Sequence, residues 1–176
     1  MVKPSDEQIE KLNDLSCFVI EVMTSMGIWS KEQLTSLTKI ELGVLRRNAT
    51  QRHGVTRWKK GISKPNNIED VDIIDIHPEL LTQEWTPYGA WVLHHEYIHA
   101  LGYLAHDSTF RDLEKLWPSK ESSIMGSKFT ETLRKKKAKW FWKCPKCSKE
   151  YPRQKKGLGK YMCRHCRVPL KDIPIK

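Results

Sequence analysis

Four cysteines in two pairs constrain the C-terminal part of this 176-residue chain more than any other feature. Cys144 and Cys147 form one Cys-x-x-Cys pair, and Cys163 and Cys166 form another after an interval of fifteen residues. This is the spacing of a structural zinc site, in which each pair contributes two thiolates to one tetrahedral ion. A short basic segment has too little apolar core to fold without the metal. The sequence therefore predicts a zinc ribbon here, and His165 could replace one of the thiolates.

Charge is divided unequally along the chain. Residues 127–176 carry 17 Lys or Arg against 3 Asp or Glu, whereas residues 1–126 carry 14 against 18, within a formal net charge of +10. A strongly basic unit suits a polyanionic partner, and a solvated basic tail is the alternative. We expect one domain over residues 1–126, a basic linker over 127–139 and the ribbon over 140–176.

The basic part also interleaves its lysines with aromatic residues. Lysines neutralise phosphates and aromatic rings stack on unpaired bases, so this part is a candidate surface for DNA, including single strands. Because the ribbon also needs a small core, we assign Trp142 and Tyr161 to that core. The candidate nucleic-acid-binding residues are then Lys135, Lys136, Lys137, Lys139, Trp140, Tyr151, Arg153, Lys155, Lys156 and Lys160.

The N-terminal part begins with two predicted helices. Apolar residues at helical spacing predict the first over residues 6–26, with Cys17 as a small core residue. Ser30 and Gln33 have the spacing of a capping box, which starts a second helix that would continue to Val44.

A strand and a third helix follow these two helices. The basic segment 46–61 predicts a turn or strand-edge region, and the alternating run VDIIDI predicts a half-buried strand over residues 71–76. Thr86 as the N-cap and Pro87 at the first helical position predict the start of the third helix. This mixture of helices and strands indicates an α+β domain.

The third helix runs into the segment HHEYIHALGYLAH, which concentrates histidines. His95 and His99 are four residues apart, so both imidazoles lie on one helix face and can bind one metal ion. His106 can be a third ligand only if the chain leaves the helix, and Gly102 offers a place for that break. Glu96 projects toward the open position of the ion, which is the place of a catalytic base.

Other residues compete for a place at this site. Glu114 or Glu121 from a following helix is the alternative third ligand. His94 faces another side of the helix, so we expect it to be packed or hydrogen-bonded. We expect structural or surface roles for His53 and His77, which lie in polar or turn surroundings.

The predicted ligand set favours a hydrolase. Three neutral imidazoles leave the charge of a zinc ion largely uncompensated, which lowers the pKa of a bound water and polarises a carbonyl. Glu96 would accept the proton of that water and deliver it to the departing amine. The strand at 71–76 is the candidate edge along which an extended peptide could pair.

The order of these motifs resembles the SprT-like zinc metalloproteases, the group that includes Spartan. HEYIH, a six-residue gap, HDSTF and a basic four-cysteine segment carry the resemblance, and RRNATQRHGVTRW and VDIIDIHPELL also resemble segments that precede the family's active-site helix. The match spans roughly residues 46–170. Asp107 stands where many members have glycine, and the gap before His106 is short. SIMG, residues 123–126, resembles the metzincin methionine turn, which would place Met125 beneath the zinc as an apolar floor.

The resemblance implies a metzincin-like, SprT-like α+β metalloprotease domain with an active-site helix and a small sheet, followed by the zinc ribbon. It implies one catalytic and one structural Zn²⁺, and a DNA-dependent endopeptidase that degrades proteins crosslinked to or bound on DNA. The alternatives are a non-proteolytic nucleic-acid-binding regulator, for which Glu96 has no use, and a peptidase without a DNA partner, which leaves the basic part unexplained. No apolar run reaches the length of a membrane span and no signal peptide is recognisable, so we expect an intracellular protein that is cytoplasmic, nucleoid-associated or nuclear.

Overall fold

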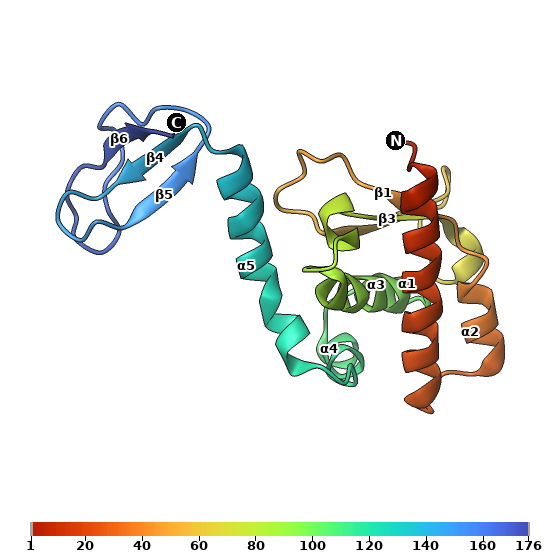
Figure 1. Cartoon of the computed structure of the whole chain (residues 1–176). Helices are drawn as coiled ribbons and strands as arrows, with labels where there is room; N and C mark the ends of the chain where they lie inside the picture. The colour runs from red at the N-terminus through yellow and green to blue at the C-terminus, as the bar shows by residue number, and fades with distance from the viewer. Residues whose placement is uncertain (1, 176) are drawn as a thin grey trace. The chain divides into compact units, whose positions relative to one another are not determined.

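The computed structural model describes residues 2–175, apart from the side chain of Ser123, and shows a mixed α+β protein (Figure 1). The chain divides into two compact units, residues 1–126 and 127–176, and each contains a small three-stranded sheet. The division falls where the net charge of the sequence changes sign. Among the described residues, no helix has both the length and the apolar character that crossing a membrane requires.

Helix α1, Asp6–Ser25, begins at a capping box in which Ser5 and Gln8 exchange hydrogen bonds. It buries one stripe of apolar residues, Leu12, Leu15, Val19 and Met23. Cys17 lies off this stripe and is exposed, so its prediction as a core residue was wrong.

Helix α2, Lys31–Leu37, begins at the predicted capping box of Ser30 and Gln33. Its predicted continuation to Val44 was wrong, because residues Leu42–Val44 form strand β1. There the backbone pairs in parallel with strand β3, with Leu42 beside Ile74. Pairing with a strand about thirty residues away overrides the helical spacing of the local apolar residues.

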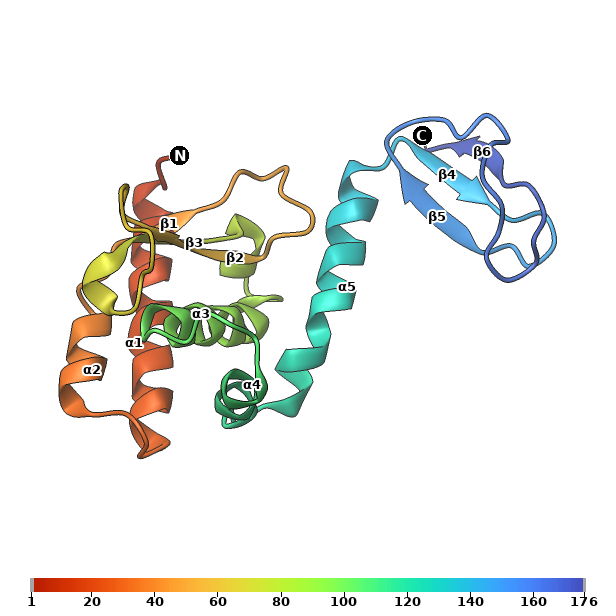
Figure 2. The same ribbon diagram turned by 180° about the vertical axis from the view of Figure 1, so that it is seen from behind.

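The sheet of the first unit has the order β1-β3-β2, with β2 at Gly54–Trp58 and β3 at Val71–Ile76 (Figure 2). A strand at 71–76 is confirmed, but five of its six residues are buried, so it is not half-buried as predicted. It is also central and not an edge, since β1 pairs with one side and β2 with the other. Strand β2, from the predicted strand-edge region, is antiparallel to β3 and forms an edge of this sheet. Two short 3-10 turns, Ile68–Asp70 and Pro78–Leu81, flank β3.

Helix α3, Thr86–Ala100, packs against α1 and against strands β2 and β3. Most of its residues are buried, which explains why its sequence is apolar nearly all round. Its N-cap is Trp85 and not Thr86, because the hydroxyl of Thr86 donates to the carbonyl of Thr82 at 2.9 Å from within the first turn. The helix ends before Gly102, which has a φ of +99°.

Two further helices follow, α4 at Ser108–Lys115 and α5 at Lys120–Lys137. The predicted methionine turn at residues 123–126 was wrong, because these residues lie within α5. The same helix extends through most of the predicted linker at 127–139.

The second unit contains strands β4 at Trp140–Lys143, β5 at Glu150–Arg153 and β6 at Lys171–Pro174, in the antiparallel order β5-β4-β6. Its core consists of Trp142, Cys144, Cys163 and Leu170. With two of four core residues being cysteines, little apolar surface is buried, and units with so small a core commonly depend on a bound metal.

Candidate metal centres

Three histidine side chains converge at the C-terminal end of α3. The Nε2 atom of His106 lies 3.0 Å from that of His99 and 3.2 Å from that of His95. His95 and His99 come from successive turns of the helix, and His106 returns to them from the loop that follows. The structure thus brings together the three histidines that the spacing singled out as ligands.

Gly102 produces the return of the chain. Its φ of +99° lies in the region that side-chain-bearing residues avoid, and it directs the backbone away from the helix axis. A Cβ at this position would lie 2.6 Å from the carbonyl oxygen of Asn66, so the close approach of a neighbouring loop also requires glycine.

Hydrogen bonds on the outer sides of the rings fix their tautomers. His99 Nδ1 donates to the carbonyl of Tyr103 at 2.8 Å, and His95 Nδ1 donates to Glu114 Oε1 at 2.7 Å. Each of these two rings, when neutral, therefore presents a lone pair at Nε2. Burial lowers the pKa of His95 and lowers that of His99 to about 4, which favours the neutral form of both.

The inward nitrogens fit a metal ion. The Nε2 atoms of His95 and His99 carry lone pairs, and both lie 3.0–3.2 Å from Nε2 of His106, so a cation among the three atoms would accept electron pairs from all of them. Zinc–nitrogen bonds of about 2.0–2.1 Å at tetrahedral angles place ligand nitrogens about 3.3 Å apart, close to the spacing seen. His95, His99 and His106 are thus able to hold one ion.

Glu114 supports this cluster from outside. Its Oε1 binds the far side of His95, and its Oε2 accepts a hydrogen bond from Arg111 at 2.5 Å, so it is not the third ligand. Burial acts to raise the pKa of Glu114, but the bonds from His95 and Arg111 lower it overall and keep the carboxylate charged. Glu121, the other alternative ligand, is exposed in the first turn of α5 and lies outside the histidine group.

Asp107 and Phe110 organise the segment that follows His106. Asp107 is the N-cap of α4, and its side chain accepts a hydrogen bond from the backbone N–H of Phe110 at 3.0 Å. Asp107, which stands where many SprT-like proteases have glycine, therefore serves to start helix α4. The Phe110 ring is fully buried, with its centroid 4.6–4.9 Å from those of all three histidine rings. Phe110 thus packs against all three rings from below the cluster, whereas Met125, for which a floor role was predicted, is half-buried on α5.

Strand β2 holds the carboxylate of Glu96. Thr56 Oγ1 donates to Glu96 Oε2 at 2.7 Å, and a Cβ at Gly54 would lie 2.7 Å from Glu96 Oε1. The glycine therefore lets the strand pass directly over the carboxylate. Only 6% of Glu96 is exposed, and burial raises its pKa to about 7. Sequence patterns did not single out Gly54 or Thr56 as residues of the site, because both lie about forty positions before Glu96, which they contact.

Glu96 and the three histidines line one cleft. Its volume is about 400 Å³, and β2 forms one of its walls. The other lining residues are Gly54, Val55, Thr56, Trp58, Pro65 and Leu104.

The remaining histidines of the first unit have structural roles, as predicted. His94 is buried, and its ring lies 5.1 Å from that of Trp117. His77 is also buried and accepts a hydrogen bond from the N–H of Glu79, and His53 is hydrogen-bonded to the Tyr88 hydroxyl at 2.7 Å.

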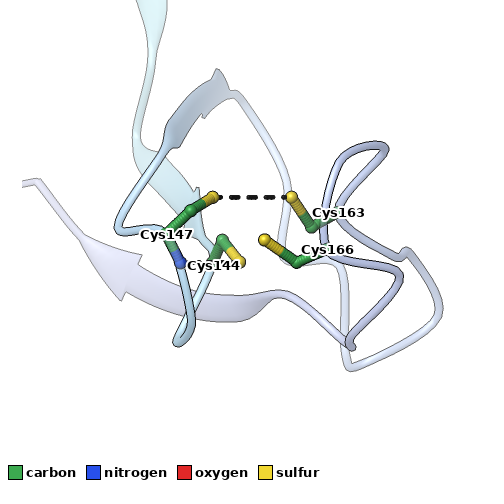
Figure 3. Close-up of side chains that lie close together, drawn as sticks. All are labelled: Cys144, Cys147, Cys163 and Cys166. Carbon is green, nitrogen blue, oxygen red and sulfur yellow. Dashed lines mark hydrogen bonds between the residues drawn. The ribbon is translucent and has the colours of Figure 1, made fainter.

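The four cysteines of the second unit form a separate cluster (Figure 3). All four sulfur atoms lie within 4.8 Å of one another, and Cys147 Sγ is 3.8 Å from Cys163 Sγ. Zinc–sulfur bonds of about 2.3 Å at tetrahedral angles place sulfurs about 3.8 Å apart. None of the four forms a disulfide, and His165 is exposed and outside the group.

Matching turns present the two cysteine pairs. After the first pair the N–H of Ser148 donates to the carbonyl of Cys144, and after the second the N–H of Arg167 donates to that of Cys163. Ser148 and Arg167 have positive φ angles of 58° and 52°. The same turn therefore occurs at corresponding positions on the two sides of the cluster.

The aromatic residues of the ribbon are placed differently from the sequence prediction. Tyr151 packs against the core, with its hydroxyl 3.7 Å from Cys163 Sγ. Trp142 is buried as predicted, and Tyr161 stacks on it at a centroid distance of 4.1 Å. Because 51% of Tyr161 is exposed, its prediction as a core residue was wrong.

The predicted basic residues are mostly exposed. Lys135, Lys136, Lys139, Lys155, Lys156 and Lys160 are exposed, whereas Lys137 and Arg153 are half-buried. Lys156 Nζ lies 4.6 Å from the ring centroid of Trp140, which joins one candidate cation to one candidate stacking residue.

No known protein family, curated protein or solved structure matches this chain.

We expect replacement of Glu114 by Gln to weaken metal binding at the histidine cluster. The variant loses the charged acceptor that orients His95, and removal of such an outer partner typically lowers affinity by about 10–100-fold. Competition with a chelator measures this affinity. Asp112→Asn is the matched control, because Asp112 is exposed on the same helix and pairs with Lys115. Equal affinities of the two variants would show that Glu114 does not support the site.

We expect Cys163→Ser to release metal from the ribbon and to unfold residues 140–175. The unit has little core without the ion. Metal content and the dispersion of amide resonances report the two effects, and His165→Asn is the control. Loss of metal in the histidine variant but not in the cysteine variant would reassign the fourth ligand.

Proposed function

We propose that this protein is a zinc-dependent endopeptidase that acts on proteins bound or crosslinked to DNA, and so serves in the repair of such crosslinks. The observation that carries the proposal is a buried carboxylate, Glu96, in the same cleft as three inward-facing histidine nitrogens. A purely structural metal site has no use for a carboxylate beside the ligands. The same feature argues against a non-proteolytic regulator.

The chemistry divides between the ligands and Glu96. A zinc ion held by His95, His99 and His106 would polarise the substrate carbonyl and lower the pKa of a bound water. Glu96 accepts a proton as the peptide carbonyl is attacked and passes it to the leaving amine. Thr56 donates to Oε2 of this carboxylate and so holds it beside the cleft.

Strand β2 supports a way of holding the substrate. It forms a wall of the cleft and is an edge of the described sheet, so its outer backbone groups are available to an extended peptide. Backbone hydrogen bonds to an added strand depend little on substrate sequence. We therefore assign to β2 the pairing role that the sequence suggested for residues 71–76.

The second unit supports a role for DNA. Its 17 Lys or Arg against 3 Asp or Glu suit phosphate contacts. Tyr161 offers a half-exposed ring backed by Trp142, and Trp140 lies beside Lys156. Asp172 fixes the neighbouring loop by accepting hydrogen bonds from the N–H groups of Gly157 and Leu158. A fixed ring next to cations suits stacking on unpaired bases.

We expect Glu96→Gln to abolish most proteolysis while it leaves both metals bound. The variant keeps the shape of the side chain but cannot accept a proton, and loss of general base catalysis costs roughly 10²–10⁴-fold in rate. Cleavage of a DNA-bound protein, with and without DNA and a chelator, measures the effect. Glu84→Gln, an exposed control just before α3, should cleave normally. Near-normal cleavage by Glu96→Gln would rule out the mechanism.

We expect Tyr161→Ala to weaken single-stranded DNA binding by roughly 1–3 kcal/mol through loss of one stacking platform. The dependence of affinity on salt should stay nearly constant, since no phosphate contact is removed. Tyr161→Phe keeps the ring and should bind normally. Fluorescence anisotropy at several salt concentrations tests both variants, and an unchanged affinity of Tyr161→Ala would place the DNA elsewhere on the ribbon.

A further inference from the structure

Basic residues are concentrated in one segment of the first unit, although that unit is acidic as a whole. Residues 46–64 contain seven of its 14 Lys or Arg and no Asp or Glu. The rest of the unit has seven Lys or Arg against 18 Asp or Glu. The positive residues of the segment are Arg46, Arg47, Arg52, Arg57, Lys59, Lys60 and Lys64.

This segment contains β2 and the loops at both of its ends. The cleft is lined by residues of β2 and by Pro65, which directly follows Lys64. The cations therefore flank the strand that forms the cleft wall: one group precedes it and the other follows it. We call the six residues other than Arg57 the basic rim.

The basic rim is free to meet a partner. All six of its side chains are exposed, and none forms an ion pair within the part of the chain that the structure describes. Arg57 differs, because its Nε lies 2.6 Å from Oδ2 of the buried Asp75 and thereby links β2 to β3. Six exposed cations without acidic neighbours in sequence create a field that favours an anionic partner.

The loops that carry the basic rim are anchored to β3. The first loop, residues 46–53, is closed at its base by two backbone hydrogen bonds. The N–H of Leu45 donates to the carbonyl of Ile76 at 2.9 Å, and the N–H of His77 donates to the carbonyl of His53 at 2.7 Å. The N–H of Lys59 donates to the carbonyl of Asp70 at 2.8 Å, which holds the start of the second loop. The two groups of cations therefore keep their places at the ends of β2.

We propose that the basic rim binds the phosphate backbone of DNA beside the cleft, as a second nucleic-acid surface separate from the ribbon. A strand of five residues is about 17 Å long, which is about half a turn of duplex DNA. Cations at both ends of β2 can thus reach phosphates of one duplex segment. The choice of DNA rests on the proposed function: a protein carried on DNA brings phosphates to the cleft with it.

An acidic peptide is the competing partner, because an extended peptide along β2 would also pass both groups of cations. Proteins that bind DNA present Lys and Arg to it, however, so acidic segments are not the expected feature of the proposed substrates. DNA is therefore the partner that agrees with the proposed substrate.

Three variants of the full chain, each with three substitutions to Gln, test the proposal. Two of them neutralise Arg46, Arg47 and Arg52, or Lys59, Lys60 and Lys64. The third is a control that neutralises Lys3, Lys31 and Lys39, which are exposed elsewhere in the same unit. All carry Glu96→Gln as well, so that DNA binding is measured without cleavage.

Binding of a short duplex is measured by anisotropy between about 50 and 200 mM salt. Affinity falls as salt rises, and each phosphate contact makes the slope of log affinity against log salt steeper by about 0.9. Each rim variant should therefore make this slope shallower by roughly 1–3. The control should leave the slope unchanged. Equal slopes for all three variants would overturn the proposal, whether or not the protein is a protease.

Two further measurements separate the remaining outcomes. The first is a variant that keeps the charge, with Arg46→Lys, Arg47→Lys and Arg52→Lys together. Its salt slope should equal that of the unsubstituted rim. If the slope falls as far as in the Gln variant, the effect is structural and the proposal fails.

The second measurement tests an acidic peptide as the partner. The rim substitutions are made with Glu96 intact, and cleavage of a peptide with acidic flanks is measured without DNA. Loss of that cleavage together with an unchanged DNA slope would assign the basic rim to acidic peptides.

Discussion

Three imidazole nitrogens converge in the first unit, where Nε2 of His106 lies 3.0 and 3.2 Å from those of His99 and His95, an arrangement that one cation among them would satisfy. Hydrogen bonds from their Nδ1 atoms to Glu114 and to the Tyr103 carbonyl fix two of the rings, and Phe110 packs beneath all three. Gly102 allows the chain to return with the third. These contacts hold the donor atoms in place, so the affinity of the cluster for an ion would depend on residues that never touch it.

The edge strand and the carboxylate are coupled through direct contact. Strand β2 passes over Glu96 because Gly54 has no side chain, and Thr56 binds one of its oxygens. The strand proposed to hold the substrate is therefore also the strand that positions the proposed base. A peptide added to β2 would pair with the strand that contacts Glu96.

Local chemistry made much of this structure predictable. The capping box at Ser30, the strand at 71–76, the break at Gly102 and both ligand groups follow from spacings of a few residues. Long-range contacts decided the rest. The position of β3 within the sheet depends on pairing with β1, and the end of α2 follows from the same ladder. Tyr151 and Tyr161 lie within eleven residues of one another, and only the folded ribbon determines that the first faces the sulfurs and the second faces outward.

The two ligand sets differ in their response to oxidation. Cys144, Cys147, Cys163 and Cys166 offer sulfur, which peroxides convert to sulfenic acid or disulfide, whereas imidazole nitrogen resists the same reagents. Oxidative damage would therefore dismantle the ribbon and leave the histidine cluster intact. A cell under oxidative stress would then hold a form of this protein whose cleft is complete but whose proposed means of attachment to DNA at the ribbon is lost.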